Sequence, residues 1–396
     1  MINFPSSPSD GQVFTSGNSA WVWSQAGGQW VAAGTATVFM PPLSTGDNRV
    51  INGDFRIDQR NNGASGTANG YTLDRWNFRQ SPTGKGTWQR NGPSAVSSVI
   101  AGNGFPYQLL FTSSSAYTPA VNDTFYFNHP IEADFVSDFA WGNANGQAVT
   151  LSFWAQSSLT GTFGGTLNNA NSPNRAYPFT YSIPSANTWT RIAITIPPPP
   201  ADGAWIMSGN GLGVNVFFDL GTGANFRGAA GAWGTGNFCG ATGAVNVVGT
   251  NGATWYLTGV KLEVGSVATP FNRQSLAASL ADCQRYYEKS YDYGISPGAT
   301  SQNNGSFLLY ATGLTATANN LSTYIAYKVS KRAAPTVTMY STISGAAGKL
   351  YSANASADVT ATVFTGGMTG ISVYGAETQA ISNVNLRGHW TSLAEL

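Results

Sequence analysis

The chain has 396 residues, of which 42% are hydrophobic and 9% are Asp, Glu, Lys or Arg, and its formal net charge is +1. An average soluble protein has about 25% charged residues, so Gly, Ser, Thr and Asn must cover much of this surface, a composition that favours strands and turns over helices. The few Lys and Arg residues are not clustered, as binding to phosphates requires, which excludes nucleic acid as a partner. No stretch approaches the roughly 18 consecutive apolar residues that a membrane-spanning helix needs.

A chain of this length is expected to form two or three domains. Residues 1–47 are the first predicted unit, in which Phe14, Trp21, Trp23 and Trp30 are separated by glycine-containing turns. This pattern predicts a short β meander with a tryptophan core. Such a small core hardly offsets the conformational entropy that the chain loses on folding. We therefore expect this module to bury more apolar surface in an oligomer or by docking onto another protein.

Residues 48–271 alternate between apolar and polar side chains, as half-buried strands do. In one such run, Val149, Leu151 and Phe153 share a face and Trp154 points to the other. Asn-Gly turn signals separate many of the runs, and this arrangement predicts a jelly-roll sandwich. The prolines at 197–200 must lie outside any central strand, because proline lacks the ladder donor.

Residues 272–292 interrupt the β pattern. Apolar side chains recur there at spacings of four, three and four residues, at Leu276, Leu280, Cys283 and Tyr287. This spacing predicts a short linking helix from Arg273 to about Gln284, followed by a tyrosine-rich strand. Residues 293–396 return to alternation and predict a C-terminal β-sandwich. The predicted fold class is therefore all-β.

Nucleophilic hydrolysis with a histidine base has only His129 and His389 to draw on, and they fall in different predicted domains. A Ser or Cys nucleophile needs an adjacent base, so we expect structural roles for both histidines and predict that the protein is not an enzyme. Cys239 and Cys283 lack a CxxC spacing, which predicts buried free thiols, no zinc site and no cofactor.

A polysaccharide-degrading enzyme would need two carboxylates about 5–10 Å apart. Glu132 with Asp134 and Asp54 with Asp58 have suitable spacings along an extended segment, but such pairs arise often by chance. Hydrogen bonding in loops is the better interpretation of both.

Four further charged residues of the first strands, Asp58, Arg60, Asp74 and Arg75, are predicted to form ion pairs that tie the first strand to its neighbour.

Sugar recognition uses an aromatic platform with polar groups beside it. Of the 12 tryptophans, Trp154 and Trp233 are least obviously part of a core, because Trp154 points away from the apolar face of its strand and Trp233 lies among glycines. Packing explains most of the others. We therefore hypothesise that Trp154 and Trp233 contact a glycan.

Several phrases of the sequence resemble the tail-fibre-like and other appendage proteins of tailed bacteriophages. They are Ile2–Pro8 and Gly11–Thr15 with Trp21-Val22-Trp23, Val50–Arg60, Gly70–Trp76, Thr258–Phe271, Cys283–Lys289, and more loosely Arg332–Pro335 and Ala394–Leu396. The resemblance implies a jelly-roll domain similar to carbohydrate-binding modules, on a trimeric virion appendage. Sugar-binding jelly rolls often hold a structural calcium ion near the point where the first and last strands meet, and Asp54 and Glu263 are the candidate ligands here, although an exposed pair without metal is the favoured interpretation.

The function that these expectations support is attachment. The protein is expected to be a structural virion protein, a tail fibre or spike subunit, that is made in the host cytoplasm and forms a homotrimer. Its N-terminal module is expected to dock on other virion proteins while its β domains face a host surface glycan. A head, neck or collar fibre is the alternative within this class, and a polysaccharide-degrading tail spike is the alternative outside it. A monomer in size-exclusion chromatography with light scattering would contradict the trimer.

Overall fold

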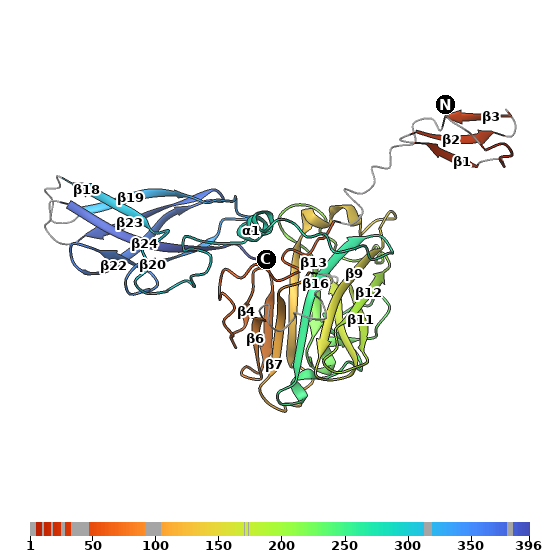
Figure 1. Cartoon of the computed structure of the whole chain (residues 1–396), viewed down its shortest axis with the longest axis horizontal. Helices are drawn as coiled ribbons and strands as arrows, with labels where there is room; N and C mark the ends of the chain where they lie inside the picture. The colour runs from red at the N-terminus through yellow and green to blue at the C-terminus, as the bar shows by residue number, and fades with distance from the viewer. Residues whose placement is uncertain are drawn as a thin grey trace. The chain divides into compact units, whose positions relative to one another are not determined.

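Figure 1 shows the computed structural model of the chain. The structure describes residues 5–9, 12–16, 19–24, 28–32, 47–91, 104–169, 171–172, 174–312, 319–377 and 383–396. Strands dominate these residues, with one α-helix and a few 3-10 turns, so the all-β class is confirmed. None of the described helices is long and apolar enough to cross a membrane. The chain divides into two compact units, Met1–Thr45 and Gly46–Leu396.

The first unit is a three-stranded antiparallel sheet in which β2 lies between its neighbours. Its strands are β1 (Val13–Ser16), β2 (Ser19–Ser24) and β3 (Gln29–Ala32). The ring centroid of Trp30 lies 5.9 Å from that of Phe14 and 5.7 Å from that of Trp23. The described residues thus form the predicted meander with an aromatic cluster.

The second unit begins with two antiparallel sheets. One sheet has the strand order β11 (Ala176–Ile183), β10 (Gly161–Asn168), β13 (Leu212–Asp219), β8 (Thr124–Glu132), β5 (Asn77–Ser81) and β4 (Gly70–Tyr71). The other has the order β12 (Thr190–Ile196), β9 (Val149–Ser157), β16 (Thr254–Val264), β7 (Gln108–Ser113) and β6 (Gly86–Asn91). Successive strands from β7 to β10 alternate between the sheets, which is the connectivity of a jelly roll.

The jelly-roll core lies between the two sheets. On β9, Val149, Leu151 and Phe153 are buried in it, as the alternation predicts. Trp255 of β16 is fully buried, and its ring lies 6.2 Å from that of Phe127 on β8, so the aromatic residues of both sheets meet there. The sequence 197–200 follows the end of β12 and forms no strand, in agreement with its prolines.

Loops and short elements connect the strands of the jelly roll. They are the 3-10 turns η3 (Ala133–Phe139), η4 (Ala224–Phe226) and η5 (Val247–Gly249) and the short parallel strands β14 (Arg227–Gly228) and β15 (Gly240–Ala241). Most of the glycine-rich stretch 221–240 is therefore loop, and β15 packs against the six-stranded sheet.

Helix α1 (Leu276–Gln284) begins three residues later than predicted. The Ser275 side chain caps it by accepting a hydrogen bond from the backbone N–H of Ala278. The expected apolar face is only partly correct: Cys283 is buried, but Leu276 is 57% exposed. The helix is only nine residues long and its most buried face is its last turn, so its first residue extends beyond the surface that it packs against.

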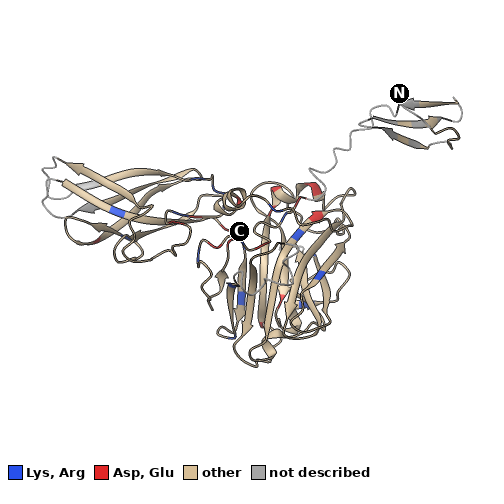
Figure 2. Ribbon diagram, in the orientation of Figure 1, with Lys and Arg blue, Asp and Glu red and all other residues tan. Residues whose placement is uncertain are grey.

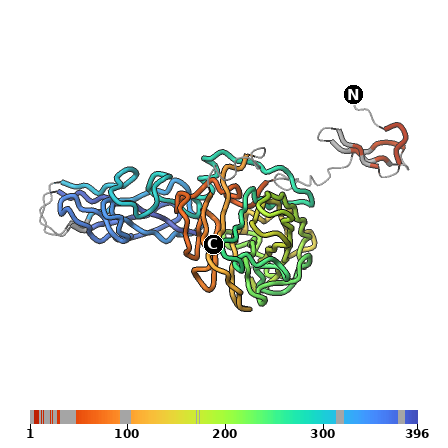
Figure 3. Tube along the Cα trace, turned by 60° about the horizontal axis from the view of Figure 1, so that its bottom comes forward, coloured from red at the N-terminus to blue at the C-terminus, as the bar shows by residue number. Residues whose placement is uncertain are grey.

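The remaining strands form an eight-stranded sheet that curls into a second sandwich, visible as a separate body of strands in Figures 1 and 3. Its main path is β17 (Tyr287–Lys289), β24 (Asn383–Leu393), β21 (Lys349–Ser352), β22 (Ala357–Gly366), β23 (Gly370–Glu377) and β19 (Asn319–Ala326), and β18 (Phe307–Thr312) and β20 (Thr336–Ser341) also pair with β24. Leu350, Val373, Leu386 and Trp390 belong to its own core.

Candidate functional site

A pocket of about 330 Å³ opens on the outer face of the five-stranded sheet. Trp154 of β9 lines it, on the face opposite to the jelly-roll core. Arg191 of β12 is the direct cross-strand partner of Trp154, so the two side chains leave the sheet side by side. Phe105 and Phe271, from two loops, complete the aromatic wall. Trp154 is partly exposed and Arg191 is exposed, so both are open to a ligand.

The aromatic wall depends on a glycine in β16. Gly259 lies at a bulge, where φ is +62°, and a Cβ atom there would lie 2.7 Å from the ring of Phe105. The Phe105 and Phe271 rings pack edge to face, with centroids 5.1 Å apart. Glycine therefore permits both the backbone conformation and the close approach that hold these rings against the sheet.

A buried ion pair anchors the loop that carries Phe271. Lys261 Nζ and Glu263 Oε2 of β16 are 3.3 Å apart, and both side chains are fully buried. Lys261 donates hydrogen bonds to Thr269 Oγ1 and to the carbonyl of Pro270, while Glu263 accepts from the N–H and the hydroxyl of Thr269. These bonds fix the loop to the sheet, so this wall of the pocket is preorganised.

The candidate calcium ligands do not fit that ion. Glu263 is paired with Lys261, and Asp54 accepts a hydrogen bond from Arg56 Nε at 2.6 Å and lies 3.4 Å from Arg273 Nε. Cations of the chain itself therefore neutralise both carboxylates, whereas calcium needs several free oxygen ligands. Within the described part of the chain, no group of three or more His, Cys, Asp and Glu is placed to hold a metal ion.

Trp233, the second predicted sugar contact, is not part of this pocket. Its ring packs edge to face against Trp141 and Trp205, with both centroid distances 5.5 Å, and its indole N–H donates to the carbonyl of Pro197 at 2.8 Å. The Trp233 side chain is partly buried against the jelly-roll core. Both tryptophans are partly buried, and Trp154 itself packs against Phe105 and Trp189, but only Trp154 lines this pocket.

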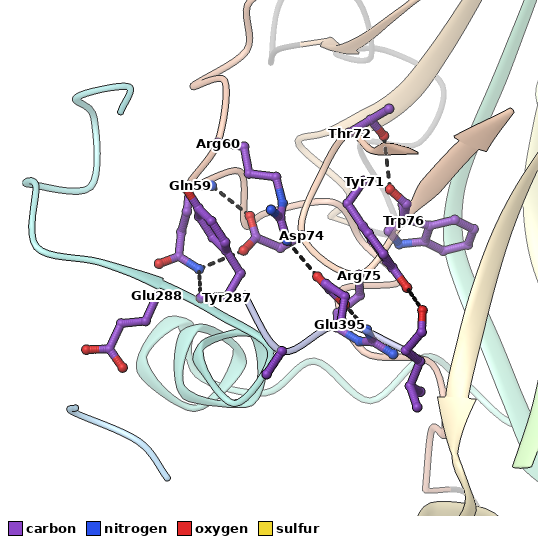
Figure 4. Close-up of polar contacts among 12 residues, drawn as sticks. Gln59, Arg60, Tyr71, Thr72, Asp74, Arg75, Trp76, Tyr287, Glu288 and Glu395 are labelled. Carbon is purple, nitrogen blue, oxygen red and sulfur yellow. Dashed lines mark hydrogen bonds and ion pairs between the residues drawn. The ribbon is translucent and has the colours of Figure 1, made fainter. Parts of the chain in front are cut away.

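A second site of interest is a buried polar network where the last residues of the sequence meet the start of the jelly roll (Figure 4). Glu395 pairs with Arg75, which is fully buried, and with Arg60 at 2.6 Å. The guanidinium carbon of Arg75 lies 3.6 Å from the ring centroid of Tyr286, and that of Arg60 lies 3.8 Å from that of Tyr287. We call these five residues the Glu395 junction.

The prediction that Asp58, Arg60, Asp74 and Arg75 pair with one another is wrong, because these residues have other partners. Arg60 and Arg75 pair with Glu395, and Asp74 accepts hydrogen bonds from the backbone and side chain of Gln59. Burial raises the pKa of Asp74. For Arg75, burial opposes the charge, but the Glu395 carboxylate together with Tyr286 and Tyr71 outweighs this effect, so the pKa of Arg75 is raised.

Two more buried pairs extend this network. Glu132, at the end of β8, accepts hydrogen bonds from Arg285 Nε at 3.0 Å and from the Tyr286 hydroxyl at 2.6 Å. Burial opposes ionisation of Glu132, but these two donors lower its pKa. Glu288 pairs with Lys331, and both side chains are fully buried. Glu132 is therefore structural, and the exposed Asp134 does not share its environment but binds the backbone N–H of Gly209.

The histidines and cysteines are buried. His129 donates from Nε2 to the carbonyl of Ile51 at 3.0 Å, and burial holds its pKa well below the ordinary value. His389 hydrogen-bonds through Nδ1 to the Ser290 hydroxyl at 2.9 Å and through Nε2 to a backbone carbonyl. This serine–histidine contact was not expected from the sequence, but His389 is fully buried. Cys239 and Cys283 are buried free thiols, as predicted.

Comparison with known proteins gives structural similarities only. No family model matches the chain, and no curated protein matches it. Among solved structures, the enzymatically active domain of tailspike protein 4 of bacteriophage CBA120 is 16% identical, with a TM-score of 0.30, over 55% of this chain and 21% of that chain. A family 11 carbohydrate-binding module from Clostridium thermocellum is 9% identical, with a TM-score of 0.25, over 52% of this chain and 98% of the module.

Proposed function

We propose that this protein is a non-catalytic virion appendage protein, a tail fibre or spike subunit, that attaches the particle to a glycan of the host surface. The observation that carries the proposal is the pocket at Trp154. A partly exposed tryptophan beside an exposed charged side chain, both fixed by a sheet, is an arrangement by which proteins hold the apolar face of a sugar ring.

The placement of the site supports binding. Strands β9, β12 and β16 fix the floor of the pocket, and the buried pair Lys261–Glu263 fixes one wall, so little conformational entropy is lost when a ligand enters. The resemblance to phage appendage proteins supports a virion protein that is made in the host cytoplasm and forms a trimer, with the N-terminal module as its contact to other virion proteins.

Two alternatives differ in what the pocket does. A head, neck or collar fibre with an architectural role would have no use for a glycan. A polysaccharide-degrading spike would need paired catalytic carboxylates, whereas Glu132 is bound to Arg285 and Tyr286 and Asp54 is paired with Arg56. The contacts of these carboxylates support the non-catalytic proposal.

The test is glycan binding by the full chain and by its Trp154→Ala variant on an array of bacterial surface glycans. We expect the wild type to bind and the variant to lose at least about tenfold in affinity, since stacking on a tryptophan contributes on the order of 1–2 kcal/mol. Trp233→Phe is the matched control and should bind as the wild type does. Binding that survives in the Trp154→Ala variant would refute this site.

A further inference from the structure

The pocket at Trp154 has an electrostatic property that its shape alone does not reveal. Arg191 is the charged residue among the described residues that line it. Arg191 is exposed and forms no ion pair or hydrogen bond with any described residue. Figure 2 shows that few charged residues lie on the strands of the jelly roll, so an uncompensated cation is a rare feature of this surface.

The nearby charges do not compensate Arg191. Glu263 lies on the same outer face of the sheet, but it is fully buried and already paired with Lys261. Arg273, whose guanidinium carbon is 5.2 Å from the ring centroid of Phe105, is paired with Asp54. The lining of the pocket therefore carries a net positive charge, with a donor group that is free to bind a ligand.

We infer that the pocket selects acidic glycans: a carboxylated sugar packs its ring on Trp154 while its carboxylate pairs with Arg191. This inference rests on the proposed glycan-binding function. A guanidinium matches a carboxylate in a bidentate geometry, which gives both strength and orientation. Because Arg191 and Trp154 are direct cross-strand partners, one monosaccharide can contact both.

The experiment uses the full chain and an array of matched pairs, in which each uronic-acid or sialic-acid oligosaccharide stands beside its methyl ester. The ester has the same ring but no charge. We expect the acid of the preferred pair to bind at least about tenfold more tightly than its ester, as is typical for a hydrogen bond to a charged group. That preference should weaken as salt concentration rises, because Arg191 is exposed.

Variants separate charge from packing. Arg191→Gln should bind the acid about tenfold more weakly than the wild type and should bind the ester as the wild type does. The affinity of Arg191→Lys for the acid should lie between those of the wild type and Arg191→Gln, since lysine keeps the charge but not the planar, bidentate guanidinium. Arg79→Gln is the matched control, because Arg79 is an exposed arginine of β5 on the other sheet. All three variants should keep the thermal stability of the wild type.

The possible outcomes test the selectivity for acidic glycans separately from the proposed glycan-binding function. Equal binding of acid and ester, both lost in Trp154→Ala, would overturn the selectivity for acids and leave glycan attachment intact. Preference for sulfated or neutral sugars would do the same. If no glycan binds in a manner that depends on Trp154, the proposed function fails and the inference fails with it.

Discussion

At the scale of single residues, this protein gives many buried polar groups a fixed partner, although some buried atoms of the described residues, such as Nδ1 of His129, have none. His129 is an example: its ring lies 5.1 Å from Trp76 in the jelly-roll core, and its Nε2 proton is used by the carbonyl of Ile51. Protonation of Nδ1 would place a charge among aromatic rings and near the charge of Arg75, which lowers the pKa of His129 after the larger effect of burial. The histidine is thus held neutral.

This environment predicts acid sensitivity. Unfolded His129 takes up a proton near its ordinary pKa of 6.5, whereas folded His129 does not, so the unfolded state binds more protons below pH 6.5. The free energy of unfolding should therefore fall as the pH falls, by about 1.4 kcal/mol at pH 5.5 for this one group. Urea unfolding at pH 5.5 and 7.5 measures it.

The His129→Gln variant provides the control for this prediction. It should be less stable than the wild type at pH 7.5, because the core is repacked, but its further loss at pH 5.5 should be smaller by about the same 1.4 kcal/mol. An identical loss between the two pH values in both proteins would show that other groups cause the acid sensitivity.

At the scale of the elements, local patterns predicted the strands well and long-range contacts poorly. The alternation in β9 placed Trp154 on the outer face correctly, because side-chain direction in a strand depends only on the neighbouring residues. The partner of Arg75 could not be predicted in the same way, since Glu395 is 320 residues away. The segments that resemble phage proteins include both Arg75 and Glu395, but the resemblance did not predict that these two residues form an ion pair.

The Glu395 junction predicts that the end of β24 is held to the jelly roll by charge. The Glu395→Gln variant would leave buried Arg75 without its anionic partner, so we expect a loss of about 3–5 kcal/mol in the free energy of unfolding. Asp202→Asn, which breaks the pair of Asp202 with Arg175, is the control, because Asp202 is 65% exposed and water screens its charge, so this variant should lose far less stability than Glu395→Gln. Equal losses in the two variants would refute the junction.

The loop that forms one wall of the Trp154 pocket also depends on contacts between elements. Lys261 and Glu263 lie on β16, at the face of the sheet opposite to the jelly-roll core, and they are covered by the loop with Thr269 and Pro270. In the sequence, Lys261 and Glu263 are two charged residues that alternate with apolar ones in a strand, a pattern that is typical of a face exposed to solvent. Only the loop that follows, which satisfies both side chains with its hydroxyl and backbone groups, turns them into a buried anchor.

At the scale of the whole molecule, the two main hydrophobic cores of Gly46–Leu396, one in each sandwich, are joined by buried polar contacts. The jelly roll and the second sandwich have separate core clusters, so apolar packing within each one does not by itself couple them. Glu132 of β8 binds Arg285 and Tyr286, which directly precede β17 of the second sandwich. This contact and the Glu395 junction connect the two sandwiches, which makes them resist separation.

Calorimetry of the full chain should therefore show Gly46–Leu396 unfolding in one main transition, whereas Glu132→Gln should separate it into two. The buried part of the second core is smaller, so that sandwich should melt first in the variant. Asp219→Asn removes an equally buried carboxylate from its pair with Arg227, but within the jelly roll alone, so it should lower the transition without dividing it. If both variants keep a single lowered transition, the sandwiches are coupled by something other than Glu132.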